Sequence, residues 1–358
     1  MEACFLSYRG KCVLVTGGLG FIGSNLVVRL VELGARVTVI DARILGCGAN
    51  NQNLAPVAGD VCVIERDIAE AESFADILRR TDLVFNLAGE ISHVHSMQFP
   101  ERDLRLNTES QLRFLLACRN AAPGIRVVFA STRQVFGIPR YLPVDEAHPI
   151  RPIDFNGIHK YAATQYHLLL RRLGELDAAV LRLTNVYGPR MALAAPCQGF
   201  LGNFFRRALT GRPIELFGDG LQERDAIYID DVVDAFLMAG LHPDFAHEDY
   251  NVGAPCGIAL RDIAAAILDA AGGGEVRYRP FPPERKAIDI GSYCTNPARL
   301  EEEFCWRPKV SLAEGCRRTI AYFRDTLPFY LDGAAEPACP LTDHYEEALQ
   351  QAPVRARV

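Results

Sequence analysis

Three glycines near the N-terminus have the spacing that binds a dinucleotide. Gly17, Gly20 and Gly23 follow a short apolar run in the stretch KCVLVTGGLGFIG. This spacing allows a tight turn, then a close approach of the backbone to a pyrophosphate, then close packing of a helix on the strand. A helix that includes Phe21 and Ile22 would present free N–H groups and the positive end of its dipole to the phosphates. The stretch predicts a phosphate-binding loop.

A carboxylate follows the loop at the distance at which such sites hold the adenosine ribose. Asp41 ends the apolar run ARVTVID, about 20 residues beyond the glycines. Its charge favours the two hydroxyls of NAD over a 2′-phosphate, although Arg43 is an alternative receiver for that phosphate. Asp67 and Ile68 follow a third apolar run, where the carboxylate could meet an adenine amino group. NAD is therefore the expected cofactor.

A stretch of non-polar residues and then a polar stretch follow the next apolar run, DLVFN. Leu87, Ala88 and Gly89 come first and are small enough to let the backbone approach a cofactor. The stretch EISHVHSMQFP then carries His93 and His95, which are candidate acid–base groups or loop contacts. No third ligand accompanies the two histidines, so no metal site is expected.

Composition indicates a globular protein that acts on a small molecule. The chain of 358 residues is 49% apolar and carries a net charge of -6, without a basic cluster, which argues against nucleic acid as a partner. The eleven cysteines include no Cys-x-x-Cys pair, which is typical of a reducing compartment. No run approaches the ~20 apolar residues of a membrane span, and the N-terminus lacks a signal-peptide core. A cytoplasmic protein without a membrane partner is expected.

Strand-like and helix-like segments alternate along the first half of the chain. This pattern predicts an α/β fold, a Rossmann-type doubly wound parallel sheet with a smaller α/β substrate-binding lobe. We expect residues 1–184 to form the NAD-binding domain and residues 185–327 mainly the lobe, with some chain returning to the first domain. Residues 328–358 are expected to be a C-terminal tail. Chemistry should lie at the carboxyl ends of the strands.

Several predicted elements carry or precede these site residues. A long helix is expected over 104–118, a helix beginning at Pro100, and a loop over 46–54. In the lobe, helices are expected over 199–209, 230–241 and 260–271, the last ended by three glycines.

A series of motifs in a fixed order runs through most of the chain. It resembles the extended short-chain dehydrogenase/reductases, in particular the nucleotide-sugar epimerases and dehydratases. The motifs are TGGLGFIG (16–23), NLAG (86–89), STRQVFG (131–137), LRLTNVYGPR (181–190), GDGLQERDAIYIDDVVDAF (218–236), YNVG (250–253) and WRPKVSLAEG (306–315).

The resemblance implies a mechanism and roles for individual residues. NAD would take a hydride from a sugar carbon while a tyrosine, activated by a lysine, removes the hydroxyl proton. Thr132 corresponds to the residue that binds the reacting hydroxyl and Lys160 to the lysine, which also binds the nicotinamide ribose. Asn185 and Arg224 correspond to residues that bind the sugar nucleotide. A homodimer is also implied.

Three further polar residues are candidate contacts to the substrate. Ser96 lies in the histidine-containing stretch, and Gln198 and Asn203 lie at the helix expected over 199–209.

The chain departs from the family pattern at the tyrosine. The pattern is Tyr-x-x-x-Lys, and Asn156 stands four residues before Lys160. A neutral amide can orient a hydroxyl or a water but cannot accept the proton. The base would then come from elsewhere, with His95, His93, Glu90 and a loop tyrosine such as Tyr141 as candidates. Among these, His95 is taken here as the catalytic candidate, beside Thr132, Asn156 and Lys160.

A second departure from the family pattern narrows the range of reactions expected of this chain. Dehydratases of the family carry an Asp-Glu pair after the threonine, and this chain has Arg133 and Gln134 there. Neither side chain exchanges protons usefully, so epimerisation through a transient keto-sugar is the expected reaction. A dehydratase, decarboxylase or oxidoreductase with a relocated base remains an alternative, as does a catalytically silent NAD-binding regulatory protein.

Overall fold

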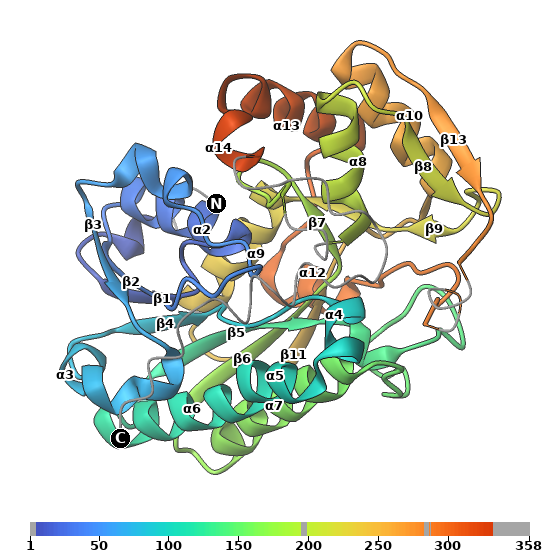
Figure 1. Cartoon of the computed structure of the whole chain (residues 1–358). Coiled ribbons are helices and arrows are strands. Elements are labelled where there is room, and N and C mark those ends of the chain that lie inside the picture. The colour runs from blue at the N-terminus through green and yellow to red at the C-terminus, as the bar shows by residue number, and fades with distance from the viewer. Residues whose placement is uncertain (1–4, 195–198, 283–285, 287, 332–358) are drawn as a thin grey trace.

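A seven-stranded parallel sheet forms the centre of the molecule (Figure 1). The computed structural model describes residues 5–194, 199–282, 286 and 288–331. The sheet has the order β11-β6-β5-β4-β1-β2-β3, so the strand order changes direction between β1 and β4. Its strands are β1 (Cys12–Thr16), β2 (Arg36–Asp41), β3 (Val61–Glu65), β4 (Leu83–Asn86), β5 (Arg126–Thr132), β6 (Asp177–Leu183) and β11 (Asp249–Val252).

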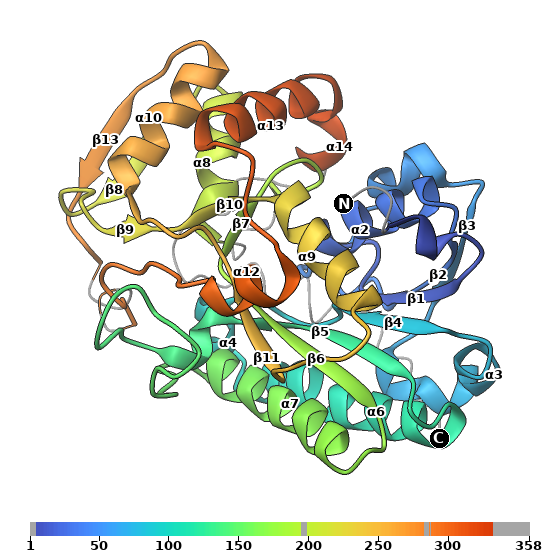
Figure 2. The ribbon, with the colours of Figure 1, turned by 180° about the vertical axis from the view of Figure 1, so that it is seen from behind.

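Helices cover both faces of this sheet, as seen from opposite sides in Figures 1 and 2. One face is covered by α6 (Ser110–Ala121) and α7 (Phe155–Arg172), and the other by α2 (Phe21–Glu32) and α9 (Ile229–Leu241). Because both faces are buried, the central strands are apolar on both sides, as in β4, whose four residues are all buried. The predicted Rossmann-type doubly wound sheet is confirmed.

Three helices and two short strands pack together beside the sheet, at the upper right of Figure 1. They are α8 (Gly199–Leu209), α10 (Leu260–Ala271), α13 (Leu312–Thr326), β8 (Ile214–Phe217) and β13 (Val276–Arg279). The helix α10 ends where predicted, because Gly272 adopts the left-handed conformation with a φ of 96°.

The remaining elements are short. They are η1 (Leu6–Tyr8), η2 (Asn51–Val57), η3 (Ile68–Phe74), α3 (Ala75–Leu78), α4 (His93–Gln98), α5 (Pro100–Leu104), η4 (Arg105–Glu109), η5 (Arg133–Phe136), β7 (Asn185–Tyr187), β9 (Glu223–Arg224), β10 (Ala226–Tyr228), β12 (Ile258–Ala259), α12 (Ala298–Phe304) and α14 (Pro328–Leu331).

Three local predictions need correction. The polar stretch before Pro100 forms the short helix α4, because the hydroxyl of Ser92 accepts a hydrogen bond from the N–H of His95 at 3.1 Å and caps it. The helix expected over 104–118 is interrupted by η4, a π-helical turn. The loop expected over 46–54 gives way to the 3-10 segment η2, capped by Asn50.

The carboxyl ends of the strands meet along one edge of the sheet. Thr16 pairs with Asn86 in register, Asn86 with Phe129, and Thr132 with Leu183. The segments that follow β1, β2, β4, β5 and β6 therefore lie side by side, as expected for a site at the switch point of such a sheet.

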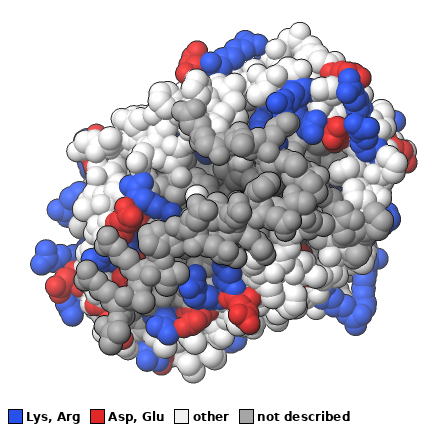
Figure 3. Space-filling view, viewed as in Figure 1, with Lys and Arg blue, Asp and Glu red and all other residues white. Residues whose placement is uncertain are grey.

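The outer surface mixes both charges. Basic and acidic side chains lie close together around the face shown in Figure 3. None of the helices described is long and apolar enough to cross a membrane.

Candidate active site

A cleft of about 320 Å³ runs along the carboxyl edge of the sheet. One wall is made by the segments that follow β1, β2, β3, β4 and β5. The other is made by residues that follow β6 and by the start of α8. Residues from most of the predicted cofactor motifs share it: Gly17, Gly20, Phe21, Ile22, Gly23, Asp41, Asp67, Ile68, Leu87, Ala88, Gly89, Thr132, Asn156, Lys160 and Asn185.

The glycine loop has the geometry of a phosphate cradle. Gly17 has a φ of 68°, and a Cβ built on it would lie 3.0 Å from the backbone of Ala88. A Cβ on Gly23 would lie 2.3 Å from the carbonyl oxygen of Gly17. Side chains at these two positions would therefore push α2 and the loop after β4 away from the turn. The N-terminus of the twelve-residue helix α2 points its N–H groups into the space that they leave.

Asp41 is held at the end of β2 by two backbone groups. Its carboxylate accepts hydrogen bonds from the N–H of Leu19 at 3.0 Å and of Arg43 at 2.9 Å. Burial raises the pKa of this carboxyl, and the two N–H groups and the Arg43 charge oppose the rise. Arg43 itself forms an ion pair with Glu65 at 3.0 Å.

Two consecutive hydrogen bonds connect the glycine loop to a residue near the end of the described chain. The carbonyl of Leu19 accepts from the amide of Asn53 at 2.8 Å, and Asn53 accepts from the hydroxyl of Tyr330 at 2.6 Å. Tyr330 lies in α14, the last helix described, and it pairs further with Tyr322 at 2.6 Å.

Asp67 and Gly89 are two further residues of the predicted cofactor site that line the cleft. Asp67 accepts from the N–H of Ala69 at 2.9 Å, which fixes its side chain at the start of η3. Gly89 has a φ of 151°, and a Cβ there would lie 2.7 Å from the Nζ atom of Lys160. The loop, the carboxylate at the end of β2 and the small residues after β4 together fit a dinucleotide.

Lys160 projects from α7 into the cleft, close to Gly89. It is 5% exposed, and its Nζ atom lies 5.6 Å from the centre of the Phe129 ring. Burial lowers the pKa of Lys160 to about 8, and the nearby carboxylates of Asp103 and Glu90 oppose the fall. A buried amine of this kind is typical of a functional site.

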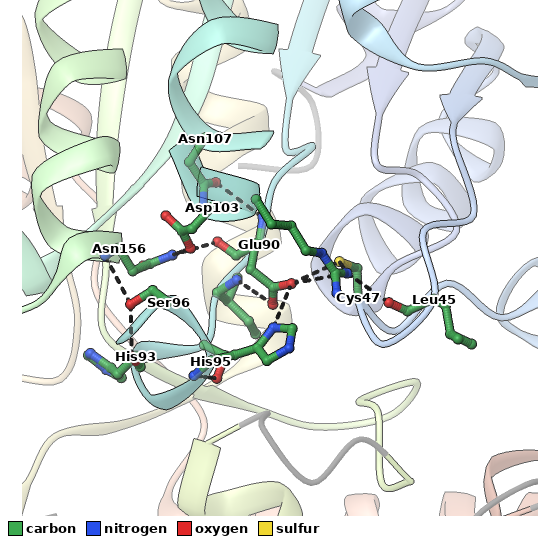
Figure 4. A network of polar contacts seen from close by, with 12 residues as sticks. Leu45, Cys47, Glu90, His93, His95, Ser96, Asp103, Asn107 and Asn156 are labelled. Atoms are coloured by element: carbon green, nitrogen blue, oxygen red, sulfur yellow. Dashed lines mark hydrogen bonds and ion pairs between the residues drawn. The ribbon is translucent and has the colours of Figure 1, made fainter. Parts of the chain in front are cut away.

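Asn156 ties three elements together one helical turn before Lys160. Its Nδ2 atom donates to the carbonyl of Glu90 at 3.0 Å and to the carboxylate of Asp103 at 2.9 Å. Its backbone N–H donates to the hydroxyl of Ser96 at 3.2 Å. The side chain therefore joins α7 to α5 and to the loop after β4, as Figure 4 shows.

Glu90 lies at the centre of the network in Figure 4. Its carboxylate accepts from the thiol of Cys47 at 3.3 Å and lies 3.6 Å from both His95 and Arg102. Burial pushes the pKa of Glu90 upward, but the hydrogen bonds and the positive charges outweigh it and hold that pKa below its ordinary value. Arg102 also donates to the carbonyl of Leu45 at 2.9 Å, so α5 holds the loop after β2 in place.

The two histidines of α4 face different surroundings. His95 is 5% exposed, packs edge-on against Phe99 and is not among the described residues that line the cleft. His93 lines the cleft. Its Nδ1 atom lies 2.6 Å from the carboxylate of Asp154 and its Nε2 atom 2.6 Å from the amide nitrogen of Gln134. The structure thus brings His93, rather than the predicted His95, to the cleft.

Thr132 ends β5 and begins η5 at the same place. Its hydroxyl accepts from the N–H of Gln134 at 3.2 Å and caps η5. Arg133 lies along the cleft wall with its guanidinium carbon 4.8 Å from the centre of the Tyr293 ring. Tyr141, a candidate base from sequence, is an exposed residue whose hydroxyl donates to Asp145 at 2.6 Å, outside the described wall of the cleft.

The predicted substrate contacts divide into two groups. Asn185 lines the cleft and donates to Asp225 at 3.1 Å. Arg224 is buried beside it, donates to the carbonyls of Glu223 and Gly291, and has its pKa lowered to about 10 by burial and by the charge of Arg133. Ser96 is buried between α4 and α7.

Of the described predicted contacts, Asn185 lines the cleft, and Arg224, Ser96 and Asn203 do not. Asn203 accepts from Arg207 at 3.1 Å. Gln198 lies outside the described residues. Among those that are described, no group of three or more histidine, cysteine or acidic side chains is placed to hold a metal.

Sequence reasoning missed Asp154 as a site residue. An aspartate directly before the helical stretch FNGIHK is a typical N-cap, and Asp154 does cap α7 by accepting from the N–H of Gly157 at 2.7 Å. Nothing in the sequence pattern signals that its second oxygen reaches His93.

Known proteins match this chain over most of its length. The model of the "NAD dependent epimerase/dehydratase family" matches residues 13–253, which span the main sheet to β11. A UDP-glucose 4-epimerase of Mycolicibacterium smegmatis is 33% identical and covers 87% of this chain and 98% of its own. A UDP-glucuronic acid decarboxylase of Arabidopsis thaliana is 27% identical and covers 88% of this chain and 70% of its own.

Solved structures are similar in fold. The UDP-glucose 4-epimerase of Thermotoga maritima, solved with UDP-glucose, has a TM-score of 0.80 and 32% identity and covers 88% of this chain and 99% of its own. That of Thermus thermophilus, in complex with NAD, has a TM-score of 0.77 and 32% identity, with 87% and 99% covered.

Proposed function

Since this chain belongs to the NAD dependent epimerase/dehydratase family, we propose that it epimerises a nucleotide sugar through a transient keto-sugar. The observation that carries the proposal is the single cleft that joins the glycine loop and Asp41 to Thr132 and the buried Lys160. The similarity to UDP-glucose 4-epimerases supports a UDP-sugar as the substrate.

The cofactor is NAD, which when bound supplies a reversible acceptor for the hydride of the sugar. The glycine loop would hold its pyrophosphate and Asp41 the adenosine ribose. The ion pair of Arg43 with Glu65 supports NAD over its 2′-phosphorylated form, because it leaves Asp41 as the dominant charge there.

The side chains of the cleft would divide the remaining work. Thr132 would bind the reacting hydroxyl, and Lys160 would bind the nicotinamide ribose and place a positive charge near the alkoxide that develops. Asn156 stands in the position of the family's tyrosine, which makes the site atypical. Because its amide group is engaged by Glu90 and Asp103, we assign the Asn156 side chain to holding α7, α5 and the loop after β4 together.

The substrate would extend toward the smaller lobe. Asn185 lines this part of the cleft, and Arg133 offers a planar positive group to a phosphate or carboxylate. We infer that residues 1–184 bind NAD and that residues 185–327 mainly bind the nucleotide sugar.

A direct experiment tests this function. The purified protein is denatured to quantify released NAD(H), and the native protein is incubated with UDP-glucose. We expect bound NAD and conversion to a sugar nucleotide of unchanged mass, separable by chromatography. A protein that neither contains nor binds NAD, or that leaves UDP-glucose unchanged, would contradict the proposal for this substrate.

Product mass separates the alternatives within the family. Loss of water would indicate a dehydratase, loss of carbon dioxide from UDP-glucuronic acid a decarboxylase, and net accumulation of reduced cofactor an oxidoreductase. Arg133 and Gln134 argue against the first two, because neither supplies a carboxylate for proton transfer. A protein that binds NAD and substrate without any turnover would be a regulatory NAD-binding protein.

We also propose a homodimer. The helices α4, α5 and α7 expose apolar side chains, with Met97 44%, Leu104 46% and Ile158 48% exposed. Apolar side chains on neighbouring helices are typical of an interface between copies.

A further inference from the structure

Few side chains of the described cleft wall are able to accept a proton. The titratable ones are Asp41, Cys47, Arg66, Asp67, His93, Arg133 and Lys160. Asp41 ends β2, three strands away from Thr132 on β5, which is about 14 Å at ~4.8 Å per strand. Asp67 follows β3, one strand further away. Both carboxylates therefore belong to the adenosine end of the cleft.

Most of the other titratable groups of the cleft wall are protonated at neutral pH. Arginine does not lose its proton in proteins. Burial and the negative charge of Glu90 raise the pKa of the Cys47 thiol, which donates its hydrogen to that carboxylate. Lys160, with its pKa lowered to about 8, is mainly a cation at neutral pH. His93 is the group that remains with a lone pair to offer.

The position of His93 is fixed from α7. The carboxylate of Asp154 accepts from the N–H of Gly157 at 2.7 Å with one oxygen and lies 2.6 Å from the Nδ1 atom of His93 with the other. Asp154 is 4% exposed. Burial alone would raise the pKa of Asp154, but the hydrogen bonds and the charge of Arg133 keep it below the ordinary value. An ionised Asp154 places the imidazole proton on Nδ1.

A second link holds the backbone of His93. The hydroxyl of Ser96 donates to the carbonyl of His93 at 2.8 Å and accepts from the N–H of Asn156 at 3.2 Å. Both the ring and the backbone of His93 are thus attached to the first turn of α7, the helix that carries Lys160.

The lone pair of His93 on Nε2 faces the side chain of Gln134, two residues after Thr132. Its Nε2 atom lies 2.6 Å from the amide nitrogen of Gln134, whose backbone N–H donates to Thr132 at 3.2 Å. The Gln134 amide donates N–H to this lone pair while the imidazole is neutral. Rotation of the amide frees the lone pair for a hydroxyl, and the amide oxygen can then accept from the imidazolium. The same side chain can therefore pair with His93 before and after proton transfer.

We propose that His93, positioned by Asp154, takes and returns the proton of the sugar hydroxyl in this chain. The inference rests on the proposed epimerase function. The O–H bond breaks and its proton passes to Nε2, while the electron pair of the C–H bond leaves with the hydrogen as a hydride, which NAD accepts. The sugar carbon is oxidised to a carbonyl and NAD is reduced. Return of the hydride and of the proton from Nε2 completes the exchange, and the imidazole is neutral again.

A pair of histidine variants tests the assignment with UDP-glucose as the substrate. His93→Gln is expected to lower kcat by ~10²–10⁴-fold, the range for loss of a general base, with little change in KM. His159→Gln is the matched control, because His159 makes a similar contact to Asp103 at 2.7 Å but is outside the described cleft wall. The control is expected to keep most of the parent's kcat. Both variants are compared for NAD content and melting temperature.

The proton position supplies a readout that does not depend on turnover. Nitrogen NMR of ¹⁵N-histidine-labelled protein with NAD bound is expected to show His93 protonated on Nδ1 and unprotonated on Nε2. Asp154→Asn keeps an N-cap for α7 but removes the negative charge, so this preference is expected to weaken and kcat to fall.

Two results would overturn the assignment of His93, and they differ from failure of the function itself. One is an active parent whose His93→Gln variant retains most of its kcat. The other is a spectrum that places the proton on Nε2, whether or not UDP-glucose is converted. If the parent converts no nucleotide sugar at all, the proposed function fails, and the role of His93 in it falls as well.

Discussion

At the scale of single residues, burial disfavours the charged form of Lys160, the lysine of the candidate site. Lys160 is 5% exposed and has its pKa lowered from 10.5 to about 8. The proposed function needs this cation beside a developing alkoxide, but the fold is less stable for keeping it there. Such an opposition between stability and function is common in active sites.

Lys160→Met is expected to abolish epimerisation and to raise the free energy of unfolding at pH 7 by about 1–3 kcal/mol. The folded pKa lies below the unfolded one, so between pH 8 and 10.5 the unfolded chain binds more protons and the parent gains stability as pH rises. The advantage of the variant should therefore be complete below pH 8 and vanish above 10.5. Urea titrations of both proteins at several pH values measure this. An equal advantage at every pH would show that packing, not charge, is responsible.

A glycine gives a second prediction at this scale. Gly23→Ala would place a Cβ 2.3 Å from the carbonyl of Gly17, so we expect a loss of stability of roughly 1–3 kcal/mol and of most of the bound NAD. Gly59→Ala is the control, since a Cβ there meets nothing within 4 Å. Thermal melts and NAD content after denaturation measure both. Normal NAD content in Gly23→Ala would contradict the role given to the loop.

At the scale of elements, the side chain of Asn156 joins α7 to α5 and to the loop after β4. Asn156→Ala removes donors from the Glu90 carbonyl and from Asp103, and a loss of roughly 1–3 kcal/mol is expected. Because the first turn of α7 also holds Asp154 and through it His93, a drop in kcat should accompany the lost stability.

Asn120→Ala is the control for this change, as Asn120 is exposed on α6. Urea titration and kinetics with UDP-glucose measure both variants. A stable Asn156→Ala variant with reduced kcat would instead favour direct contact of Asn156 with the substrate.

The elements themselves could largely be predicted from sequence. The strands were found because β1, β4 and β5 are apolar runs bounded by turn residues, and α8 and α10 because their apolar residues recur at helical spacing. The helix α4 was missed because it is short and polar and depends on a cap by Ser92. Residues two apart in a helix point about 200° apart, so which histidine faces the cleft depends on α4 existing.

The proposed cofactor contacts rest on local sequence patterns, and the proposed catalytic contacts do not. Gly17, Gly23 and Asp41 act through local backbone geometry, which sequence spacing encodes. The contact of His93 with Asp154 joins residues 61 positions apart, and no spacing rule predicts it. The role of Asn156 likewise depends on Asp103, on another helix.

At the scale of the whole molecule, the proposed dimer makes a separate prediction. Ile158→Glu would place a charge among exposed apolar side chains on α4, α5 and α7, and we expect a shift from dimer to monomer. Leu221→Glu is the control, an equally exposed leucine at 48% in the smaller lobe. Light scattering after size-exclusion chromatography measures the mass. A parent that is already monomeric would contradict the proposal.

The hydrogen bonds from Tyr330 through Asn53 to Leu19 have a consequence for how the protein is made. The glycine loop leaves the ribosome well before Tyr330, which is 311 residues behind Leu19. The glycine loop therefore acquires this support only after about 311 further residues have been made. A nascent chain stalled before α14 would contain the whole glycine loop and would still lack Tyr330, which supports it through Asn53.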